Sequence, residues 1–315
     1  MSYGIRKQKE GRRTVEKQKL SIMEVERFAI HDGPGIRSTV FLQGCPLHCP
    51  WCANPESQSI GRKLMYYEKK CIKCGKCVQN CPQKAIEEKN EELYFHRDQC
   101  IGCETCKQGC MQDAIDFSGV VKTVDEIVEM VLRDRDYYEE SGGGVTISGG
   151  ECFVQFNGFL ELIRKLKQEG LHVAVETCGQ TSLEKIVEAE PYIDLFLFDL
   201  KHMDLETFAR ITGGNLLDIL RNIRYLAEHC PEKVIIRVPV IPDFNFHDVV
   251  IKDIMYFVKE LGLQRIDLLP YHIFGINKYR QLGIPYQMNV KESLKNEELE
   301  VYCKIGEDMG LSIQK

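Results

Sequence analysis

One motif is written twice in the middle of this 315-residue chain. The two copies align without gaps and read CIKCGKCVQNCPQKAIE at 71–87 and CIGCETCKQGCMQDAID at 100–116. Each copy spaces four cysteines as C-x2-C-x2-C-x3-C and ends in Ala-Ile-Glu or Ala-Ile-Asp. Because closely spaced thiols on a tight loop can bind several metal atoms together, the repeat predicts a small metal-binding module at 59–117.

The cysteine spacing resembles that of bacterial two-cluster ferredoxins, in which the fourth cysteine of each run binds the cluster of the other run. On that resemblance, we expect one [4Fe–4S] cluster on Cys71, Cys74, Cys77 and Cys110, and a second on Cys81, Cys100, Cys103 and Cys106. Pro82 follows the first run as in ferredoxins, whereas Met111 follows the second. The alternative is a zinc module, because C-x2-C pairs also bind Zn²⁺.

The placement of the cysteines favours metal ligation over disulfide formation. Eleven of the fifteen lie between 45 and 110. Secreted disulfide scaffolds reach such counts in short chains with little core, whereas this chain is 43% hydrophobic and has periodic apolar segments. Of the other four, we expect Cys178, Cys230 and Cys303 to be packing residues, and Cys152 either to pack or to serve as a ligand or redox group.

The charge distribution excludes several classes of partner. A net charge of −6 does not predict nucleic-acid binding, and no run of about 18 apolar residues predicts a membrane span. The first nineteen residues hold seven Lys or Arg and two Glu, without the apolar segment of a secretory signal. We therefore expect a cytoplasmic protein with a solvated basic tail at 1–20.

Outside 59–117, short β-branched segments alternate with longer amphipathic ones. Strands are predicted at Ser38–Leu42, Val145–Ser148, Val173–Glu176, Leu195–Asp199, Val234–Val238 and Ile266–Leu269. Helices are predicted at Val124–Tyr138, Phe159–Glu169, Leu183–Ala189, Leu216–His229 and Val249–Leu261. This alternation indicates an α/β fold with a parallel sheet, and six strands suggest a partial (β/α)6 barrel.

Polar residues lie at or just beyond the carboxyl ends of five of the predicted strands. They are Ser148-Gly149-Gly150-Glu151, Glu176-Thr177, Asp199-Leu200-Lys201, Arg237 and His272. Active sites of β/α barrels lie at the carboxyl ends of the strands. We therefore expect these groups to meet at one site, although Glu176 and Thr177 could equally form local hydrogen bonds at the end of their strand.

Three further cysteines, Cys45, Cys49 and Cys52, follow the first predicted strand as C-x3-C-x2-C. Three thiolates on a [4Fe–4S] cluster leave one iron without a protein ligand. A small molecule that carries an amine and a carboxylate can bind such an iron, and S-adenosylmethionine carries both. An electron from the cluster can then break a C–S bond of the sulfonium to give methionine and a 5′-deoxyadenosyl radical.

This spacing, with the aromatic Trp51 before the last cysteine, resembles the radical S-adenosylmethionine (SAM) superfamily. The longer segment IHDGPGIRSTVFLQGCPLHCPWCANPESQ at 30–58 is similar to the glycyl-radical enzyme activating enzymes, typified by pyruvate formate-lyase activating enzyme. The motifs SGGE, DLK and LLPYH follow in the same order. The resemblance implies a radical SAM partial barrel at 21–58 and 118–315, with a ferredoxin-like insert at 59–117.

The resemblance also implies roles for individual residues. Cys45, Cys49 and Cys52 would bind the catalytic cluster, and Trp51 through Ala53 would contact the adenine. The turn Gly149-Gly150-Glu151 would receive the methionine amine, since glycines allow close approach to the backbone. Asp199, Leu200 and Lys201 would contact the ribose and the methionine carboxylate. His272 would lie near the bound cofactor, and Asp32 would border the entry of the partner's glycine loop. His48 and His202 are expected to be structural.

The implied function is the removal of hydrogen from a backbone glycine of a partner enzyme of the eliminase or lyase type, with three [4Fe–4S] clusters and SAM as cofactors. A flavodoxin or ferredoxin would supply electrons, and the protein would be an anaerobic, cytoplasmic monomer. The alternatives are a radical SAM enzyme that modifies another peptide or a small molecule, and a ferredoxin-like electron carrier. A pure carrier would leave the SGGE and DLK motifs unexplained.

Overall fold

The computed structural model describes residues 17–290 and 292–315. Most of the basic tail predicted at 1–20 therefore lies outside the described residues. Its last two residues belong to strand β1 (Lys19–Ala29), and Leu20 is fully buried. The central sheet thus begins two residues before position 21, where the sequence placed the start of the barrel.

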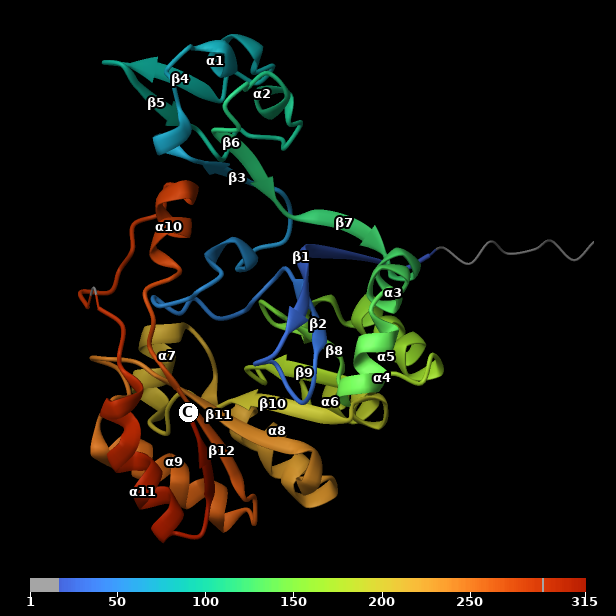
Figure 1. Cartoon of the computed structure of the whole chain (residues 1–315). Helices are drawn as coiled ribbons and strands as arrows, with labels where there is room; N and C mark the ends of the chain where they lie inside the picture. The colour runs from blue at the N-terminus through green and yellow to red at the C-terminus, as the bar shows by residue number, and fades with distance from the viewer. Residues whose placement is uncertain (1–16, 291) are drawn as a thin grey trace, which may run out of the picture.

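Nine strands form one sheet, around which most of the chain is built (Figure 1). Their order is β13-β12-β11-β10-β9-β8-β2-β1-β7, and neighbours from β2 to β13 pair in parallel. The six predicted strands are confirmed, with ends that differ by no more than two residues, as is the predicted parallel sheet. Besides β1, the strands are β2 (Arg37–Leu42), β7 (Val120–Thr123), β8 (Gly144–Gly149), β9 (Val173–Thr177), β10 (Leu195–Asp199), β11 (Val234–Val240), β12 (Arg265–Pro270) and β13 (Ser312–Gln314).

Antiparallel pairing at one end of the sheet was not predicted. β1 pairs antiparallel with both β2 and β7. The first part of β1 is buried, and in its second part the partly buried Met23 and Val25 alternate with the exposed Glu24 and Glu26. Its pairing with β2 is irregular between Glu26 and Ala29, where Phe28 has a φ of 61°.

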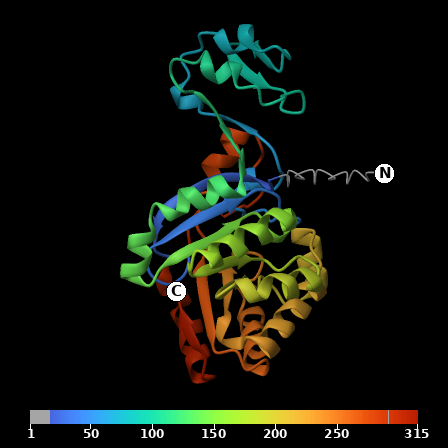
Figure 2. The ribbon, with the colours of Figure 1, turned by 90° about the vertical axis from the view of Figure 1, so that its right-hand side faces the viewer.

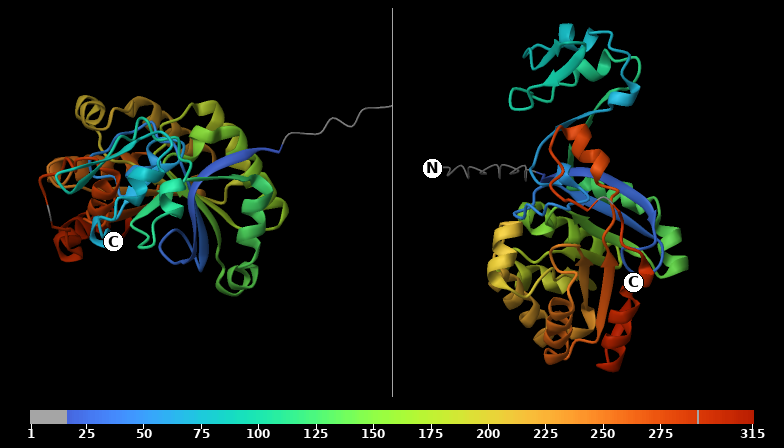
Figure 3. Two further views of the ribbon diagram at one scale, coloured as in Figure 1. Left: turned by 90° about the horizontal axis from the view of Figure 1, so that it is seen from above. Right: turned by 90° about the vertical axis from the view of Figure 1, so that its left-hand side faces the viewer.

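Helices cover one face of the sheet, and the main core lies between the two layers (Figure 3). Phe196 and Phe198 of β10 face this core, whereas Leu195 and Leu197 lie on the other face in a small separate cluster. None of the described helices is long and apolar enough to cross a membrane. Outside the insert, the helices are α3 (Val124–Leu132), α4 (Arg135–Ser141), α5 (Phe156–Gln168), α6 (Leu183–Ala189), α7 (Leu205–Thr212), α8 (Leu216–His229), α9 (Asp248–Glu260), α10 (Ile276–Leu282) and α11 (Glu300–Asp308).

The helix predicted at Val124–Tyr138 is wrong as a single helix, because α3 ends at Leu132 and α4 begins at Arg135. Asp134, between them, is buried and turned inward. Its carboxylate accepts hydrogen bonds from Arg27 and from Ser38 Oγ. Two partners on β1 and β2 therefore hold a residue that sequence periodicity alone would leave inside one helix.

The insert forms a separate small unit that stands above the sheet (Figures 1 and 2). Two antiparallel strand pairs, β3 with β6 and β4 with β5, frame two short helices. Their bounds are β3 (Lys63–Tyr66), α1 (Lys76–Asn80), β4 (Ile86–Lys89), β5 (Glu92–Phe95), α2 (Thr105–Gln108) and β6 (Ile115–Ser118). Its own small core contains Leu64, Ile86, Cys106 and Ile115.

Candidate active site

A cavity of about 290 Å³ lies at the carboxyl ends of the parallel strands, as the sequence predicted for the polar groups that follow them. Ten of the predicted site residues line it: Cys45, Cys49, Trp51, Cys52, Ala53, Gly149, Gly150, Asp199, Lys201 and His272. The structure does not place Glu151, Leu200 or Asp32 in its lining. We call this space the thiol pocket.

The loop that carries Cys45, Cys49 and Cys52 follows β2 and is fixed by backbone hydrogen bonds. Gly44 N donates to Ser57 O at 2.6 Å, so the segment after the cysteines folds back onto the segment before them. Burial raises the pKa of Cys49 to about 12 and that of Cys52 to about 11. Within the described ranges, no three His, Cys, Asp or Glu side chains are grouped as around a single metal ion.

The glycine turn after β8 packs directly against the backbone of the cysteine loop. Gly149 has a φ of +116°, which L side chains rarely adopt. A Cβ at Gly150 would lie 2.3 Å from Gly44 O and 3.1 Å from Ser57 O. Glu151 N donates to Gly44 O at 2.7 Å. Both glycines are therefore required by the close packing of three backbone segments, in addition to any approach of a ligand.

The carboxylate of Glu151 is fully buried and lies behind Thr177 and Cys178, which line the thiol pocket, whereas Glu151 itself is not in the lining. Its Oε1 accepts from Phe153 N at 3.2 Å, and its Oε2 accepts from Cys178 N at 2.9 Å. Thr177 Oγ1 lies 2.9 and 2.8 Å from the two oxygens, which share its single O–H donor. Glu151 therefore ties the glycine turn to the end of β9, and its side chain does not face the space available to a cofactor.

Asp199 and Lys201 form an ion pair on one side of the pocket, with Asp199 Oδ2 and Lys201 Nζ 2.6 Å apart. Burial opposes the charge of Lys201, but the Asp199 carboxylate and nearby thiols outweigh it and raise the pKa of Lys201. In the part of the chain that the structure describes, the buried Asp199 Oδ1 has no hydrogen-bond partner. A free carboxylate oxygen beside an ammonium group fits a ligand that offers both hydroxyl and carboxylate groups.

A second ion pair lies on the face of the sheet that carries Leu195 and Leu197, and no role was predicted for it. Arg237 Nη1 lies 2.8 Å from Glu176 Oε1, and Ser148 Oγ bonds the other oxygen of Glu176. Polar residues at strand ends were the only signal for this cluster. Among the described residues, Arg237 and Leu269 line both the thiol pocket and a larger cavity behind it.

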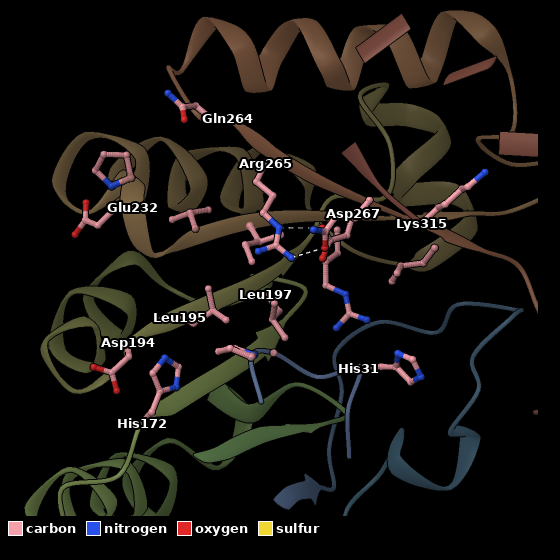
Figure 4. Close-up of a pocket in the computed structure, with 18 of the residues that line it drawn as sticks. His31, His172, Asp194, Leu195, Leu197, Glu232, Gln264, Arg265, Asp267 and Lys315 are labelled. Atoms are coloured by element: carbon pink, nitrogen blue, oxygen red, sulfur yellow. Dashed lines mark hydrogen bonds and ion pairs between the residues drawn. The ribbon is translucent and has the colours of Figure 1, made fainter. Parts of the chain in front are cut away.

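The larger cavity, of about 910 Å³, opens toward the amino ends of the strands. Figure 4 shows His172, Asp194 and Arg265 around it, with Leu195 and Leu197 along its wall. Gly33 and Pro34 also line it. It carries none of the predicted cysteine ligands, so its larger size does not make it the better candidate for the chemistry.

Asp32 is placed beside this larger cavity by a network that the sequence did not reveal. Its carboxylate accepts from Thr39 Oγ1 at 2.7 Å. The fully buried guanidinium of Arg37 holds the same turn, because it donates to Pro34 O at 3.1 Å and to Val145 O at 2.7 Å. Burial lowers the pKa of Arg37 to about 10.

Trp51 and His272 lie at the rim of the thiol pocket. The Trp51 ring packs against Phe244 with centroids 4.5 Å apart, and His272 stacks on the exposed Phe274 at 4.7 Å. Neither His48 nor His202 lines the pocket. His202 is buried, and its Nδ1 accepts from Asp204 N at 2.9 Å.

Two cysteines that were not predicted to bind a cluster lie near the thiol pocket, and one of them lines it. Cys178 was expected only to pack, but it lines the thiol pocket, and its thiol lies 3.0 Å from Glu151 Oε2. Hydrogen bonding to Cys178 lowers the pKa of Cys45. Cys152 is fully buried outside the pocket lining, 3.5 Å from Glu151 Oε1.

Two smaller cavities in the insert divide its eight cysteines into two sets of four. Cys71, Cys74, Cys77 and Cys110 line the first, which we call the outer set. Cys81, Cys100, Cys103 and Cys106 line the second, the inner set. These are the two sets that the ferredoxin resemblance implies. Gly75 and Glu104, with φ of 68° and 62°, turn the chain into α1 and α2 at equivalent places in the repeat.

Helix α10 connects the insert to the cysteine loop. Lys278 Nζ donates to Asn54 Oδ1 at 2.7 Å and to the buried Glu56 at 2.6 Å, just after the last cysteine of the loop. At the other end of the helix, Arg97 of the insert donates to Gln281 O at 3.0 Å. Helix α10, which is about 10 Å long, thus contacts both cysteine-bearing regions.

Comparisons with known proteins agree with this arrangement. A model of the radical SAM superfamily matches residues 99–252, and a 4Fe-4S dicluster domain matches residues 70–115. The chain also resembles the crystal structure of a radical SAM methyltransferase from Sphaerobacter thermophilus, with a TM-score of 0.52 and 13% identity over 93% of this chain and 76% of that one. At this identity the likeness concerns the fold alone.

Two curated relatives match over almost their whole length. The trans-4-hydroxy-L-proline dehydratase activating enzyme of Clostridioides difficile is 41% identical, over 89% of this chain and 93% of that enzyme. The choline trimethylamine-lyase activating enzyme of Oleidesulfovibrio alaskensis is 37% identical, over 90% and 93% respectively. The chain therefore belongs to the glycyl-radical enzyme activating enzymes of the radical SAM superfamily.

Proposed function

We propose that this enzyme reductively cleaves SAM and removes a hydrogen atom from a backbone glycine of a partner glycyl-radical enzyme. One observation carries the proposal. The thiol pocket brings together three cysteines, the Gly149-Gly150 turn and the Asp199–Lys201 pair. The curated relatives, named as activating enzymes of different partners, support the same reaction class.

The chain's own groups fit the two cofactors in distinct ways. Cys45, Cys49 and Cys52 would hold a [4Fe–4S] cluster with one iron open to SAM. Asp199 Oδ1, which is buried and without a partner among the described residues, would accept from a ribose hydroxyl, while Lys201 pairs with the carboxylate. When bound, the cluster and SAM supply the reductive C–S cleavage that generates the 5′-deoxyadenosyl radical.

The other predicted residues would complete the SAM site. Trp51 and Ala53 would contact the adenine, and the backbone of Gly149 and Gly150 would receive the amine. His272, at the rim, would shield the cofactor from one side. We assign Glu151 and Leu200 indirect roles, because the Glu151 side chain is turned inward and the fully buried Leu200 donates its N–H to Arg237 O at 2.9 Å.

The insert at 59–117 would hold two further [4Fe–4S] clusters, one on the outer set and one on the inner set, for a total of three. We take residues 21–58 and 118–315 as the radical SAM barrel, with Lys19 and Leu20 added to its first strand. The sheet would then be a partial barrel, in which Leu195 and Leu197 face the interior and a cavity of about 910 Å³ occupies it.

The partner's glycine loop would enter through the larger cavity. Gly33 and Pro34, next to Asp32, line that cavity, and Arg237 lies on the lining of both cavities. An extended segment entering there would reach the thiol pocket past the Arg237–Glu176 pair. We propose a partner of the eliminase or lyase type, an electron-donating flavodoxin or ferredoxin, and a monomeric enzyme in an anaerobic cytoplasm.

The proposal is tested with anaerobically reconstituted protein. Wild-type protein should bind about twelve iron atoms per chain, and the variant Cys45→Ala/Cys49→Ala/Cys52→Ala about eight. With SAM and dithionite, the wild type should release 5′-deoxyadenosine and the variant none. The matched control is Cys230→Ala, since Cys230 is buried outside all three cysteine-lined cavities. Release of 5′-deoxyadenosine by the triple variant would refute the assignment of the catalytic cysteines.

A further inference from the structure

Four exposed lysines surround the outer set of cysteines. Lys69 and Lys70 precede Cys71, and Lys73 and Lys76 lie within the first cysteine run. Two apolar side chains are exposed among them, Ile72 at 63% and Met111 at 83% of their surface. We call Lys69, Lys70, Ile72, Lys73, Lys76 and Met111 the lysine face.

Three members of the lysine face lie together beside the outer cysteine set. Ile72, Lys76 and Met111 line the same cavity as Cys74, which is itself exposed. Lys76 Nζ lies 3.8 Å from Met111 Sδ, so the two halves of the repeat meet here. Among the described residues, none of the four lysines forms a salt bridge within 4 Å, and Lys70 Nζ lies 4.8 Å from the centre of the Tyr67 ring.

The lysine face is the positive end of a polar insert. Residues 62–84 contain seven Lys or Arg and one Glu, whereas residues 87–116 contain eight Asp or Glu and three Lys or Arg. The whole chain has a net charge of −6, so the charge of this positive surface is opposite in sign to that of the chain. The acidic part of the insert begins close to the lysine face, because Glu88 Oε2 lies beside Gly75, 3.4 Å from where a Cβ of that residue would be.

The strand register places the outer set farther from the barrel than the inner set. Tyr66 and Ile115 form a pair and line the outer cavity, whereas Leu64 and Phe117 form a pair and line the inner one. The chain enters and leaves the insert beyond Leu64 and Phe117, at Lys63 and Ser118. Two residues along a strand correspond to about 7 Å. Figure 1 accordingly shows α1 at the end of the insert away from the sheet.

We propose that the lysine face is the docking site for an acidic one-electron carrier protein. This rests on the proposed function, in which each cleavage of SAM consumes one electron that the carrier loses. A small apolar centre with a rim of like charges suits the short-lived, small interfaces of redox partners. Opposite charge on the carrier would steer its approach and make association strongly dependent on salt.

The test uses reconstituted holoenzyme and a purified acidic flavodoxin as the probe. The variant is Lys69→Glu/Lys70→Glu/Lys76→Glu; Lys73 is left unchanged because its φ is 55°. The control with the same change in total charge is Lys252→Glu/Lys259→Glu/Lys304→Glu, on α9 and α11. Stopped-flow spectroscopy measures the rate at which reduced flavodoxin bleaches the cluster absorbance at 50 mM and 300 mM NaCl.

We expect the lysine-face variant to slow this rate about tenfold or more at the lower salt concentration, with a smaller effect at the higher one. The control should retain the wild-type rate. With dithionite, which needs no protein docking site, both variants should release 5′-deoxyadenosine at wild-type rates. A variant with the same three lysines changed to glutamine should be reduced by flavodoxin at a rate between those of the wild type and the glutamate variant. It would replace the glutamate variant if that variant lost iron.

Equal rates of bleaching in the lysine-face variant and the wild type would overturn the proposal. So would an equal loss in the control, which would assign the effect to total charge. Weaker binding of the partner glycyl-radical enzyme with an unchanged flavodoxin rate would also overturn it, in favour of partner docking. A failure of the proposed function would look different, because the wild type would release no 5′-deoxyadenosine with dithionite although flavodoxin still bleached the clusters.

Discussion

Replacing Glu151 by glutamine separates the structural role of its side chain from a role in cofactor binding. Glutamine keeps the shape but puts an NH₂ group in place of one carboxylate oxygen. In either orientation, this group faces a backbone N–H, that of Phe153 or that of Cys178. One buried N–H then has no acceptor, which costs about 1–3 kcal/mol.

The expected effect is a loss of about 2 kcal/mol in the free energy of unfolding. With an unfolding entropy of roughly 2.1 cal/mol/K per residue, a chain of 315 residues should lose about 3 °C in Tm. Because the side chain is not in the lining of the thiol pocket, the Kd for SAM should change less than twofold. Anaerobic differential scanning calorimetry measures Tm, and isothermal titration calorimetry measures the Kd.

The matched control is Glu188→Gln, since the Glu188 side chain is 52% exposed and pairs with Arg164 at 3.3 Å. Exposed substitutions of this kind change stability by less than about 0.5 kcal/mol. An unchanged Tm in Glu151→Gln, together with SAM binding weakened tenfold or more, would show that the Glu151 side chain contacts the cofactor and has no structural role.

Three further predictions concern the groups that position the site. Arg37→Met should lower the free energy of unfolding by about 3 kcal/mol in urea titrations, because Pro34 O and Val145 O lose their buried donor; a loss below about 0.5 kcal/mol would contradict this. Burial lowers the pKa of His172 below its ordinary value of about 6.5, so stability should be lost as pH falls below 6.5. His172→Asn should flatten this dependence of Tm on pH, and an unchanged slope would count against it. Lys278→Met should speed amide hydrogen exchange at residues 53–58, since Glu56 loses its cation, whereas Lys252→Met should leave exchange there unchanged.

The regular parts of the fold could be predicted because their signals are local. Strands such as Leu195–Asp199 are short β-branched or aromatic runs, and the alternation with helices is enough to indicate a parallel sheet. The polar strand ends also gather as predicted, because the carboxyl ends of parallel strands share one edge. The second half of β1 has no such run, because the charged and exposed Glu24, Glu26 and Arg27 interrupt its apolar residues.

Contacts between distant segments could not be predicted in the same way. Lys278 and Glu56 are 222 residues apart, and nothing in either neighbourhood indicates their pairing. The direction of the Glu151 side chain depends on where β9 ends, and the break between α3 and α4 depends on Arg27 and Ser38. These contacts depend on how distant segments pack, whereas a sequence motif identifies only the residues of one segment.

The most direct test of the central claim is electron paramagnetic resonance of a partner enzyme after activation. Reconstituted protein, SAM and a reductant would be mixed anaerobically with glycyl-radical enzymes of the types that its relatives are named for, including a trans-4-hydroxy-L-proline dehydratase and a choline trimethylamine-lyase. We expect a glycyl-radical signal on one such partner, absent when its glycine is replaced by alanine or when Cys45, Cys49 and Cys52 are replaced. Release of 5′-deoxyadenosine without a radical on any partner of this class, and with a modified small molecule or another peptide instead, would contradict it.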